Sequence, residues 1–161
     1  MILIIILRKV RDMELKPLNI DGLIAKYPIV QGGMGVGISL DRLAGNVALA
    51  GGVGIISTAQ IGFREPGYDE KPLETNLAAI KKYIDKAREI ANGGVIGVNI
   101  MVATRHYEEY VKAAVKAGSP ICAVSLQGLP TRSFLEYTSF LTHSSALYYV
   151  VLDVVSTENC M

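Results

Sequence analysis

Hydrophobic runs and helical patterns alternate along the first 125 residues of the chain. Short apolar runs predict buried strands at 28–31, 53–57, 95–101 and 120–125. Between these runs, hydrophobic residues recur at spacings of three and four, which predicts helices over 40–50, 73–91 and 105–117. The strands are almost continuously apolar, as expected when both faces of a parallel sheet are buried. The pattern therefore predicts an α/β fold of strand–helix units, with Thr104 and Ser39 as helix N-caps.

The two ends of the chain depart from this pattern. Residues 1–12 hold a short apolar run followed by basic residues, the wrong order for a secretory signal and too short to span a bilayer. We interpret them as an N-terminal extension, either strand-like or translated upstream of a natural start at Met13. Every glycine lies at or before Gly128, and Arg132 is the only Lys or Arg beyond it. Residues 126–161 are therefore interpreted as a divergent tail of the kind that a frameshift leaves, with a fifth strand within 148–155 as the alternative.

Composition limits the class of protein. The chain has 161 residues, is 50% hydrophobic and 19% charged, and carries a formal net charge of +1. These values predict one globular domain, and they argue against nucleic acid or a membrane surface as a partner, because both require clustered basic residues. Cys122 and Cys160 have no metal-ligand spacing and are expected to be free thiols of a cytoplasmic protein.

The segment 32–37 carries the clearest candidate chemistry. It places four glycines within six residues, directly after the first predicted strand and before the first predicted helix. Glycine permits close approach of the backbone to a ligand, and a helix N-terminus favours negative charge. A flat or phosphorylated cofactor would fit such a turn. The spacing matches neither a P-loop nor the Rossmann fingerprint, and an ordinary strand–helix loop remains the alternative.

Several segments in order resemble the nitronate monooxygenase family, formerly called 2-nitropropane dioxygenases. They are Pro-Ile-Val-Gln-Gly-Gly-Met-Gly at 28–35, Leu-Ala-Gly at 43–45, Ala-Gly-Gly-Val-Gly-Ile-Ile-Ser at 50–57 and Gly-Val-Asn-Ile-Met at 97–101. The resemblance covers about residues 15–120. It implies FMN as cofactor and a (β/α)8 barrel, in a family that includes the flavin-containing enoyl-ACP reductase II.

The resemblance also implies a set of site residues. The turn Gly33-Met34-Gly35 would lie against the flavin ring, and Asn99 would reach the flavin from the end of its strand. For Asn99, the alternative is a carboxamide that bonds loop backbone; for Met34, it is plain packing. Barrel sites form where strands end, so further polar residues would converge on the same mouth. These are Gln31, Ser57 and Ser125.

The chain departs from the family pattern in its second part. Where the family reads roughly Ser-Gly-Ala-Gly-Leu-Pro, residues 125–130 place Leu126 and Gln127, whose side chains would intrude on the cofactor. The family's catalytic histidine has no counterpart, since neither His106 nor His143 lies in a matching segment. A (β/α)8 barrel needs about 250 residues. The expected fold is therefore the N-terminal half of a truncated TIM barrel, with residues 13–125 as a partial FMN-binding domain.

The function implied by the resemblance is FMN-dependent oxidation of alkyl nitronates with O2 to a carbonyl compound and nitrite. A first alternative is NAD(P)H-dependent reduction of enoyl-thioesters or quinones. A second, of another class, is a non-catalytic half-barrel that self-associates through its exposed sheet edges.

Overall fold

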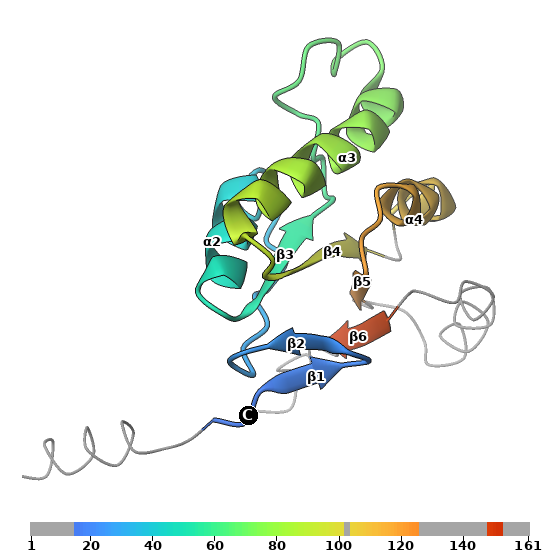
Figure 1. Ribbon diagram of the computed structural model, residues 1–161. Coiled ribbons are helices and arrows are strands. Elements are labelled where there is room, and N and C mark those ends of the chain that lie inside the picture. The colour runs from blue at the N-terminus through green and yellow to red at the C-terminus, as the bar shows by residue number, and fades with distance from the viewer. Residues whose placement is uncertain (1–14, 102–103, 126–147, 153–161) are drawn as a thin grey trace, which may run out of the picture.

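The fold is a parallel sheet covered by helices on one face. The computed structural model describes residues 15–101, 104–125 and 148–152, with side chains described to residue 120. The elements in chain order are β1 (Leu18–Ile20), β2 (Leu23–Ala25), α2 (Asp41–Leu49), β3 (Val53–Ser57), α3 (Pro72–Ala91), β4 (Val95–Met101), α4 (Tyr107–Lys116), β5 (Ile121–Ser125) and β6 (Tyr148–Leu152). Within these described residues, β3, β4, β5 and β6 form a parallel sheet in that order, and β1 pairs with β2 (Figure 1).

Side chains alternate between the two faces of β3 and β4, as the pleat of a strand requires. Ile56, Ile96 and Val98 face the helices and belong to the larger hydrophobic core. Val53 and Val95 face the other way and pack with the hairpin β1–β2 in a second, smaller core. Both faces of the strands are therefore buried, which explains why the sequence shows continuous apolar runs there.

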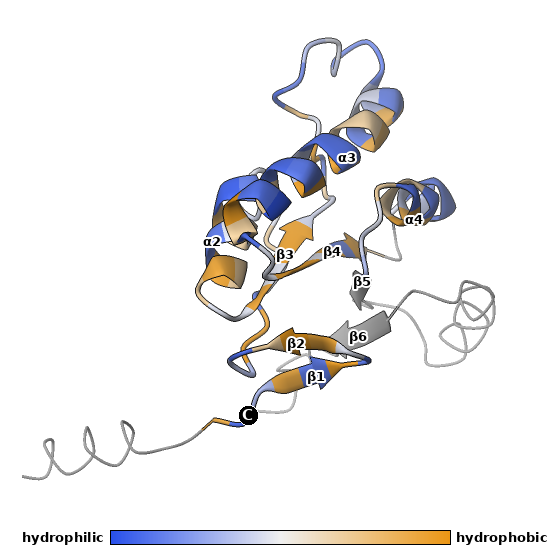
Figure 2. Ribbon diagram, in the orientation of Figure 1, coloured by the Kyte–Doolittle hydropathy of each residue, from blue (hydrophilic) through white to orange (hydrophobic). Residues whose placement is uncertain are grey.

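The helices form one layer over the sheet. The buried residues of α3 recur at helical spacing and its opposite face is polar, as Figure 2 shows. Helix α2 crosses β3 at Gly54, where a Cβ atom would lie only 2.6 Å from the carbonyl carbon of Ala44. Glycine is required at this position because the helix backbone fills the space that a side chain would occupy.

The hairpin β1–β2 was not predicted from the sequence. Its turn is formed by Asp21 and Gly22, both with positive φ, and the Gly22 amide donates a hydrogen bond to Asn19 Oδ1 (2.8 Å). An Asp-Gly pair between short apolar runs is the usual signal for such a turn. The hairpin lies on the opposite side of the sheet from α2 and α3 (Figure 1).

Three local expectations need correction. The segment 28–31 is not a full buried strand: only Val30 bridges to Val53, in parallel, and Ile29 is exposed. The third predicted helix begins at Tyr107, not at 105, and its N-cap is His106 in the left-handed conformation in place of Thr104. A strand within residues 148–155, given above as the alternative for the tail, is present as β6 and lies parallel to β5.

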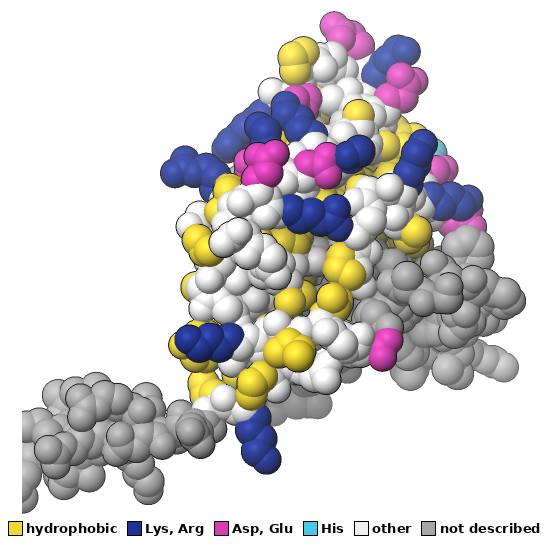
Figure 3. Space-filling model, viewed as in Figure 1, with side chains coloured by type: hydrophobic (Ala, Val, Ile, Leu, Met, Phe, Trp, Pro, Cys, Tyr) yellow, Lys and Arg dark blue, Asp and Glu magenta, His cyan; other side chains and the backbone are white. Residues whose placement is uncertain are grey.

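Charge is concentrated on the helical side. Acidic and basic side chains gather over α3 and α4, whereas hydrophobic side chains are visible over the hairpin (Figure 3). Among the described residues, no helix is both long and apolar enough to cross a membrane. The expectations for residues 1–12 and for Leu126, Gln127, His143 and Cys160 lie outside the described residues.

Candidate functional site

The expected site residues gather at the carboxyl ends of neighbouring parallel strands. Ser57 pairs in register with Asn99, and Met101 pairs with Ser125. The Val30 bridge places the glycine turn beside the carboxyl end of β3. Ser57 and Asn99 lie on the sheet face that carries Val53 and Val95, but farther along the strands than the hairpin contact. This edge of the sheet is where barrel sites form.

The glycine turn is in direct contact with Asn99 and with the loop after β3. A Cβ atom on Gly33 would overlap the Asn99 side chain, lying 2.8 Å from its Cγ. A Cβ atom on Gly35 would lie 2.9 Å from the Ala59 Cβ and 3.6 Å from Ser57 Oγ. From the sequence, these glycines are expected to permit the approach of a ligand. In the structure, the protein's own side chains occupy that space.

The outer side of the turn is open to solvent. Its hydrophobic side chains are half exposed: Met34 to 46%, Val36 to 44% and Ile38 to 57%. A Cβ atom on Gly32 would have no neighbour within 4 Å. Met34 therefore does not serve as core packing, which was the alternative to a ligand contact. An apolar, solvent-facing turn beside polar strand ends can contact a flat ring that is apolar on its faces and polar at its edge.

Ser39 does not cap the helix as expected, and its hydroxyl instead holds the turn together. The side chain is fully buried, and its Oγ accepts hydrogen bonds from the Met34 amide (2.9 Å) and from Gln31 Nε2 (2.9 Å). It donates to the Gly32 carbonyl oxygen (3.2 Å). One donor and two acceptor sites are all that a hydroxyl offers, so none is left for the helix. Leu40 is the N-cap of α2, without a side-chain hydrogen bond.

Gln31 presents an unusual buried acceptor. Its Nε2 donates to Ser39 Oγ and to the carbonyl oxygen of Ile55 (3.0 Å). Turning the carboxamide over would set oxygen against the Ile55 carbonyl, so these contacts fix the orientation of the amide. Its Oε1 is buried and has no hydrogen-bond partner among the described residues. A buried acceptor without a donor is unfavourable, which makes this atom a candidate contact for a bound N–H group.

The two strand-end residues are themselves buried and polar. Ser57 is 3% exposed and Asn99 8% exposed. Ser57 Oγ accepts a long hydrogen bond from the Ala59 amide (3.4 Å). The backbone carbonyl oxygen of Asn99 accepts hydrogen bonds from the amide (3.0 Å) and from the hydroxyl (2.9 Å) of Thr58. This role of Thr58 was not predicted from the sequence. These bonds join the carboxyl end of β4 to the loop after β3.

The structure brings together most of the predicted residues. Gly33 contacts Asn99, Gly35 lies beside Ser57, and Gln31 joins the group through Ser39. Ser125 ends β5 at the same edge, and its side chain lies outside the description. None of the predicted site side chains is ionisable, so any recognition by them depends on neutral hydrogen bonds and apolar contact. The described residues hold no cluster of His, Cys, Asp or Glu side chains fit to bind a metal ion.

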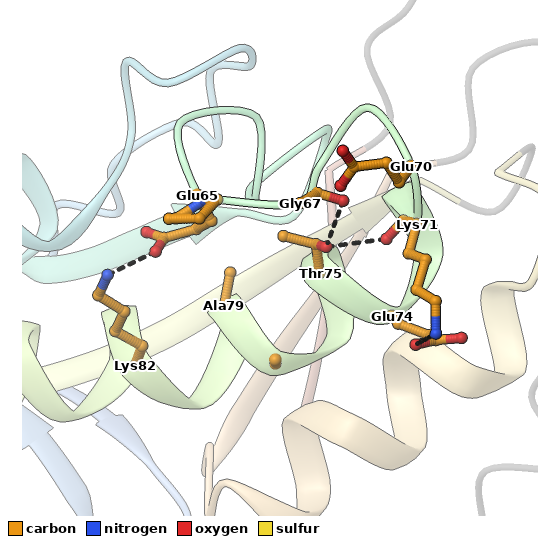
Figure 4. Close-up of a pocket in the computed structure, with 10 residues that line it drawn as sticks. Glu65, Gly67, Glu70, Lys71, Glu74, Thr75, Ala79 and Lys82 are labelled. Carbon is orange, nitrogen blue, oxygen red and sulfur yellow. Dashed lines mark hydrogen bonds and ion pairs between the residues drawn. The ribbon is translucent and has the colours of Figure 1, made fainter.

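A separate cleft of about 500 Å³ lies between the loop after β3 and the first half of α3 (Figure 4). Four of its five charged side chains form ion pairs, Lys82 with Glu65 (2.6 Å) and Lys71 with Glu74 (3.2 Å). The hydrogen bond from Lys82 lowers the pKa of Glu65, and burial raises the pKa of Tyr83, whose hydroxyl also donates to Glu65. These mutual pairs give the cleft a structural role, so we do not assign the site to it.

Ser39 was predicted to cap the following helix, but its side chain holds the glycine turn instead. Its place before a helix is the usual signal of an N-cap. The bonds that it makes instead reach back over five to eight residues, to Met34, Gly32 and Gln31. Only the folded path of the turn brings these groups together.

The comparisons with known proteins agree with this architecture. The family model described as "Nitronate monooxygenase" matches residues 16–142, beyond residue 120 where the resemblance in the sequence ended. No curated protein matches the chain. FabK from Thermotoga maritima is similar in structure, with a TM-score of 0.52 and 26% sequence identity, over 77% of this chain. The chain spans 33% of the length of that FabK structure. With most of its residues matched by the family model, the chain belongs to the nitronate monooxygenase family, a family of FMN-dependent oxidoreductases.

Proposed function

We propose that this chain binds FMN at the glycine turn and that its reaction is the oxidation of alkyl nitronates. The observation that carries the proposal is the position of a half-exposed apolar turn, residues 34–38, beside the buried polar side chains of Ser57 and Asn99. Family membership supports the cofactor, and the position of the turn at the carboxyl edge of a parallel sheet supports the site.

The residues present fit a flavin in three respects. The exposed side chains of Met34 and Val36 offer apolar contact for the faces of the ring. Gln31 Oε1 is a buried acceptor that lacks a donor among the described residues, and the imide N–H of a flavin is such a donor. The carboxamide of Asn99, at the carboxyl edge of the sheet, can both donate and accept. Ser57 and Ser125, at the ends of β3 and β5, complete the proposed set.

Each part of the site would have a distinct task. The turn would bind the ring and exclude water from one side of it, while Gln31 and Asn99 would orient its polar edge. FMN, when bound, would supply the electron transfer between substrate and O2. In the overall reaction, the nitronate carbon gains an oxygen atom from O2 as its bond to nitrogen breaks, so that two nitronates and one O2 give two carbonyl compounds and two nitrites. We assign no catalytic acid or base.

The test begins with binding. The purified 161-residue chain should quench the fluorescence of added FMN and shift its visible absorption. Riboflavin and free adenine nucleotides serve as comparison ligands. Nitrite release from an alkyl nitronate under air should then require added FMN. Absence of any FMN binding by folded protein would refute the proposal. Binding without nitrite release would retain the cofactor and refute the reaction.

Two other functions have support from particular observations. The similarity to FabK favours NAD(P)H-dependent reduction of an enoyl-thioester or quinone. Anaerobic bleaching of bound FMN by NADH or NADPH, followed by reoxidation with the acceptor, would identify that activity. The exposed apolar side chains of the turn favour a non-catalytic protein that self-associates. Light scattering of folded, colourless protein would reveal it.

A further inference from the structure

We propose that Ser39 is the positioning residue of the site, fixing both the glycine turn and the carboxamide of Gln31. The proposal deepens the proposed function, on which it rests for the identity of the ligand. It does not require Ser39 to touch that ligand, because the Ser39 side chain is fully buried.

The hydroxyl of Ser39 connects two parts of the turn. It accepts from the Met34 amide and donates to the Gly32 carbonyl, on either side of Gly33. The Ser39 amide adds a bond to the Met34 carbonyl oxygen (3.0 Å). Gly33 is thus held between two anchored peptide groups while it contacts Asn99. A turn with three glycines in four residues has high conformational freedom, which these bonds restrict.

The same hydroxyl determines what Gln31 offers to a ligand. With Nε2 engaged by Ser39 Oγ and the Ile55 carbonyl, the donor side of the carboxamide is used within the protein. Only the acceptor, Oε1, is left without a partner among the described residues. Loss of the Ser39 hydroxyl would release one of these contacts and let the carboxamide rotate. Ser39 therefore fixes the site as an acceptor for an N–H donor.

Ser39 is also tied to the sheet. Its carbonyl oxygen accepts a hydrogen bond from the Ser57 amide (2.9 Å), so the backbone of Ser39 anchors the turn to the last residue of β3. This backbone bond does not depend on the side chain. A substitution of the side chain can therefore loosen the turn while leaving its attachment to the sheet in place.

The experiment compares Ser39→Ala with Ser119→Ala, the same change at a buried serine after α4, and with Ser39→Thr, which retains a hydroxyl. Amide hydrogen exchange of the FMN-free protein is measured by NMR at Met34, and FMN affinity by fluorescence titration. We expect Ser39→Ala to raise both the Met34 exchange rate and the Kd for FMN by about tenfold. Ser119→Ala should change neither, and Ser39→Thr should restore the affinity at least in part.

The outcomes separate this proposal from the proposed function. Unchanged Met34 exchange in folded Ser39→Ala would overturn the positioning role, as would an equal loss of affinity in Ser119→Ala. If wild-type protein binds no FMN, the proposed function fails, while the exchange rates still decide whether Ser39 fixes the turn. If Ser39→Thr does not fold, the comparison of the two alanine variants alone decides.

Discussion

Gly33 lies so close to Asn99 that a single added carbon would overlap the Asn99 side chain. This contact joins the glycine turn to the carboxyl end of β4, two segments separated by more than sixty residues of sequence. It also supplies a physical reason for glycine at position 33 that is independent of any ligand. The first predictions follow from it.

Gly33→Ala should destabilise the protein by about 1–3 kcal/mol, because the new methyl group must displace Asn99. Gly32→Ala is the matched control, since a Cβ atom there meets nothing within 4 Å, and it should change stability by less than about 0.5 kcal/mol. Urea unfolding of both variants provides the measurement. Equal stability of the two variants would contradict the close contact.

The contact between Gly33 and Asn99 should also appear as an energetic coupling. Asn99→Gly removes the side chain that Gly33→Ala would strike, so Gly33→Ala should cost less in that background, by about 1 kcal/mol or more. Asn99→Ala should not give this relief, because it retains the Cβ atom that the new methyl group meets. A double-mutant cycle of unfolding free energies measures both. Additive effects in the glycine background would argue against the contact.

Gly54→Ala should destabilise more strongly than Gly33→Ala, by about 3 kcal/mol or more. The added Cβ would meet the backbone of α2 at Ala44, and a helix backbone cannot rotate away as a side chain can. Gly94→Ala should behave alike, because its Cβ would meet the backbone of the same helix, 2.6 Å from the carbonyl carbon of Ala48. Thermal unfolding measures both effects. Near-native stability of either variant would show that α2 can shift away from the sheet.

Gln31→Met should weaken FMN binding by about tenfold, because methionine keeps the length of the side chain but removes the buried acceptor Oε1. It also removes the Nε2 hydrogen bonds to Ser39 and Ile55 that hold the side chain in place. The same substitution at the exposed residue Gln60 is the control and should leave the affinity unchanged. Fluorescence titration with FMN measures both, after circular dichroism has shown that each variant is folded. Unaltered affinity in Gln31→Met would remove Gln31 from the proposed set of ligands.

Glu65→Gln should lower the unfolding temperature by a few degrees at neutral pH, because the ion pair with Lys82 is lost. The hydrogen bond from Lys82 lowers the pKa of Glu65 below its ordinary value in the folded state, so the ion pair contributes to stability above that ordinary pKa. The contribution is lost as the pH falls through the folded pKa, and the wild-type and variant curves should converge there.

The control for Glu65→Gln is Glu74→Gln, which removes a pair whose side chains are both largely exposed. Such a pair contributes little, so this variant should unfold close to the wild-type temperature at every pH. A pH-independent difference between wild type and Glu65→Gln would show that the lost charge is not the cause.

The strands β3 and β4 could be predicted from the sequence to the residue. Both are buried on two faces, and each apolar run begins directly after a glycine, Gly52 or Gly94. The long helix α3 was equally clear, since Ile80, Ile84 and Ala87 repeat on one face and are buried. In these elements, local pattern and tertiary burial agree.

Predictions were wrong where a tertiary contact outweighed a local preference. Ser39 could not cap α2 because its hydroxyl is used by the turn. Thr104 lost its expected role because the chain turns left-handed at His106 before the helix begins. The gathering of Gln31, Gly33, Ser57 and Asn99 was anticipated through family resemblance and strand order. The buried Oε1 of Gln31, which has no hydrogen-bond partner among the described residues, was not anticipated. Its lack of a partner depends on contacts that only the folded structure makes visible.

The alternation of side chains along β4 has a consequence for engineering. Ile96, Val98 and Ile100 secure the helices, whereas Asn99 and Met101 belong to the opposite face. Residues that pack against the helices therefore alternate along β4 with residues on the face of the proposed site. A mutant library restricted to residues 99 and 101 would diversify the sheet face opposite the helices and leave the helical layer intact, which makes this strand a natural place to begin redesigning specificity.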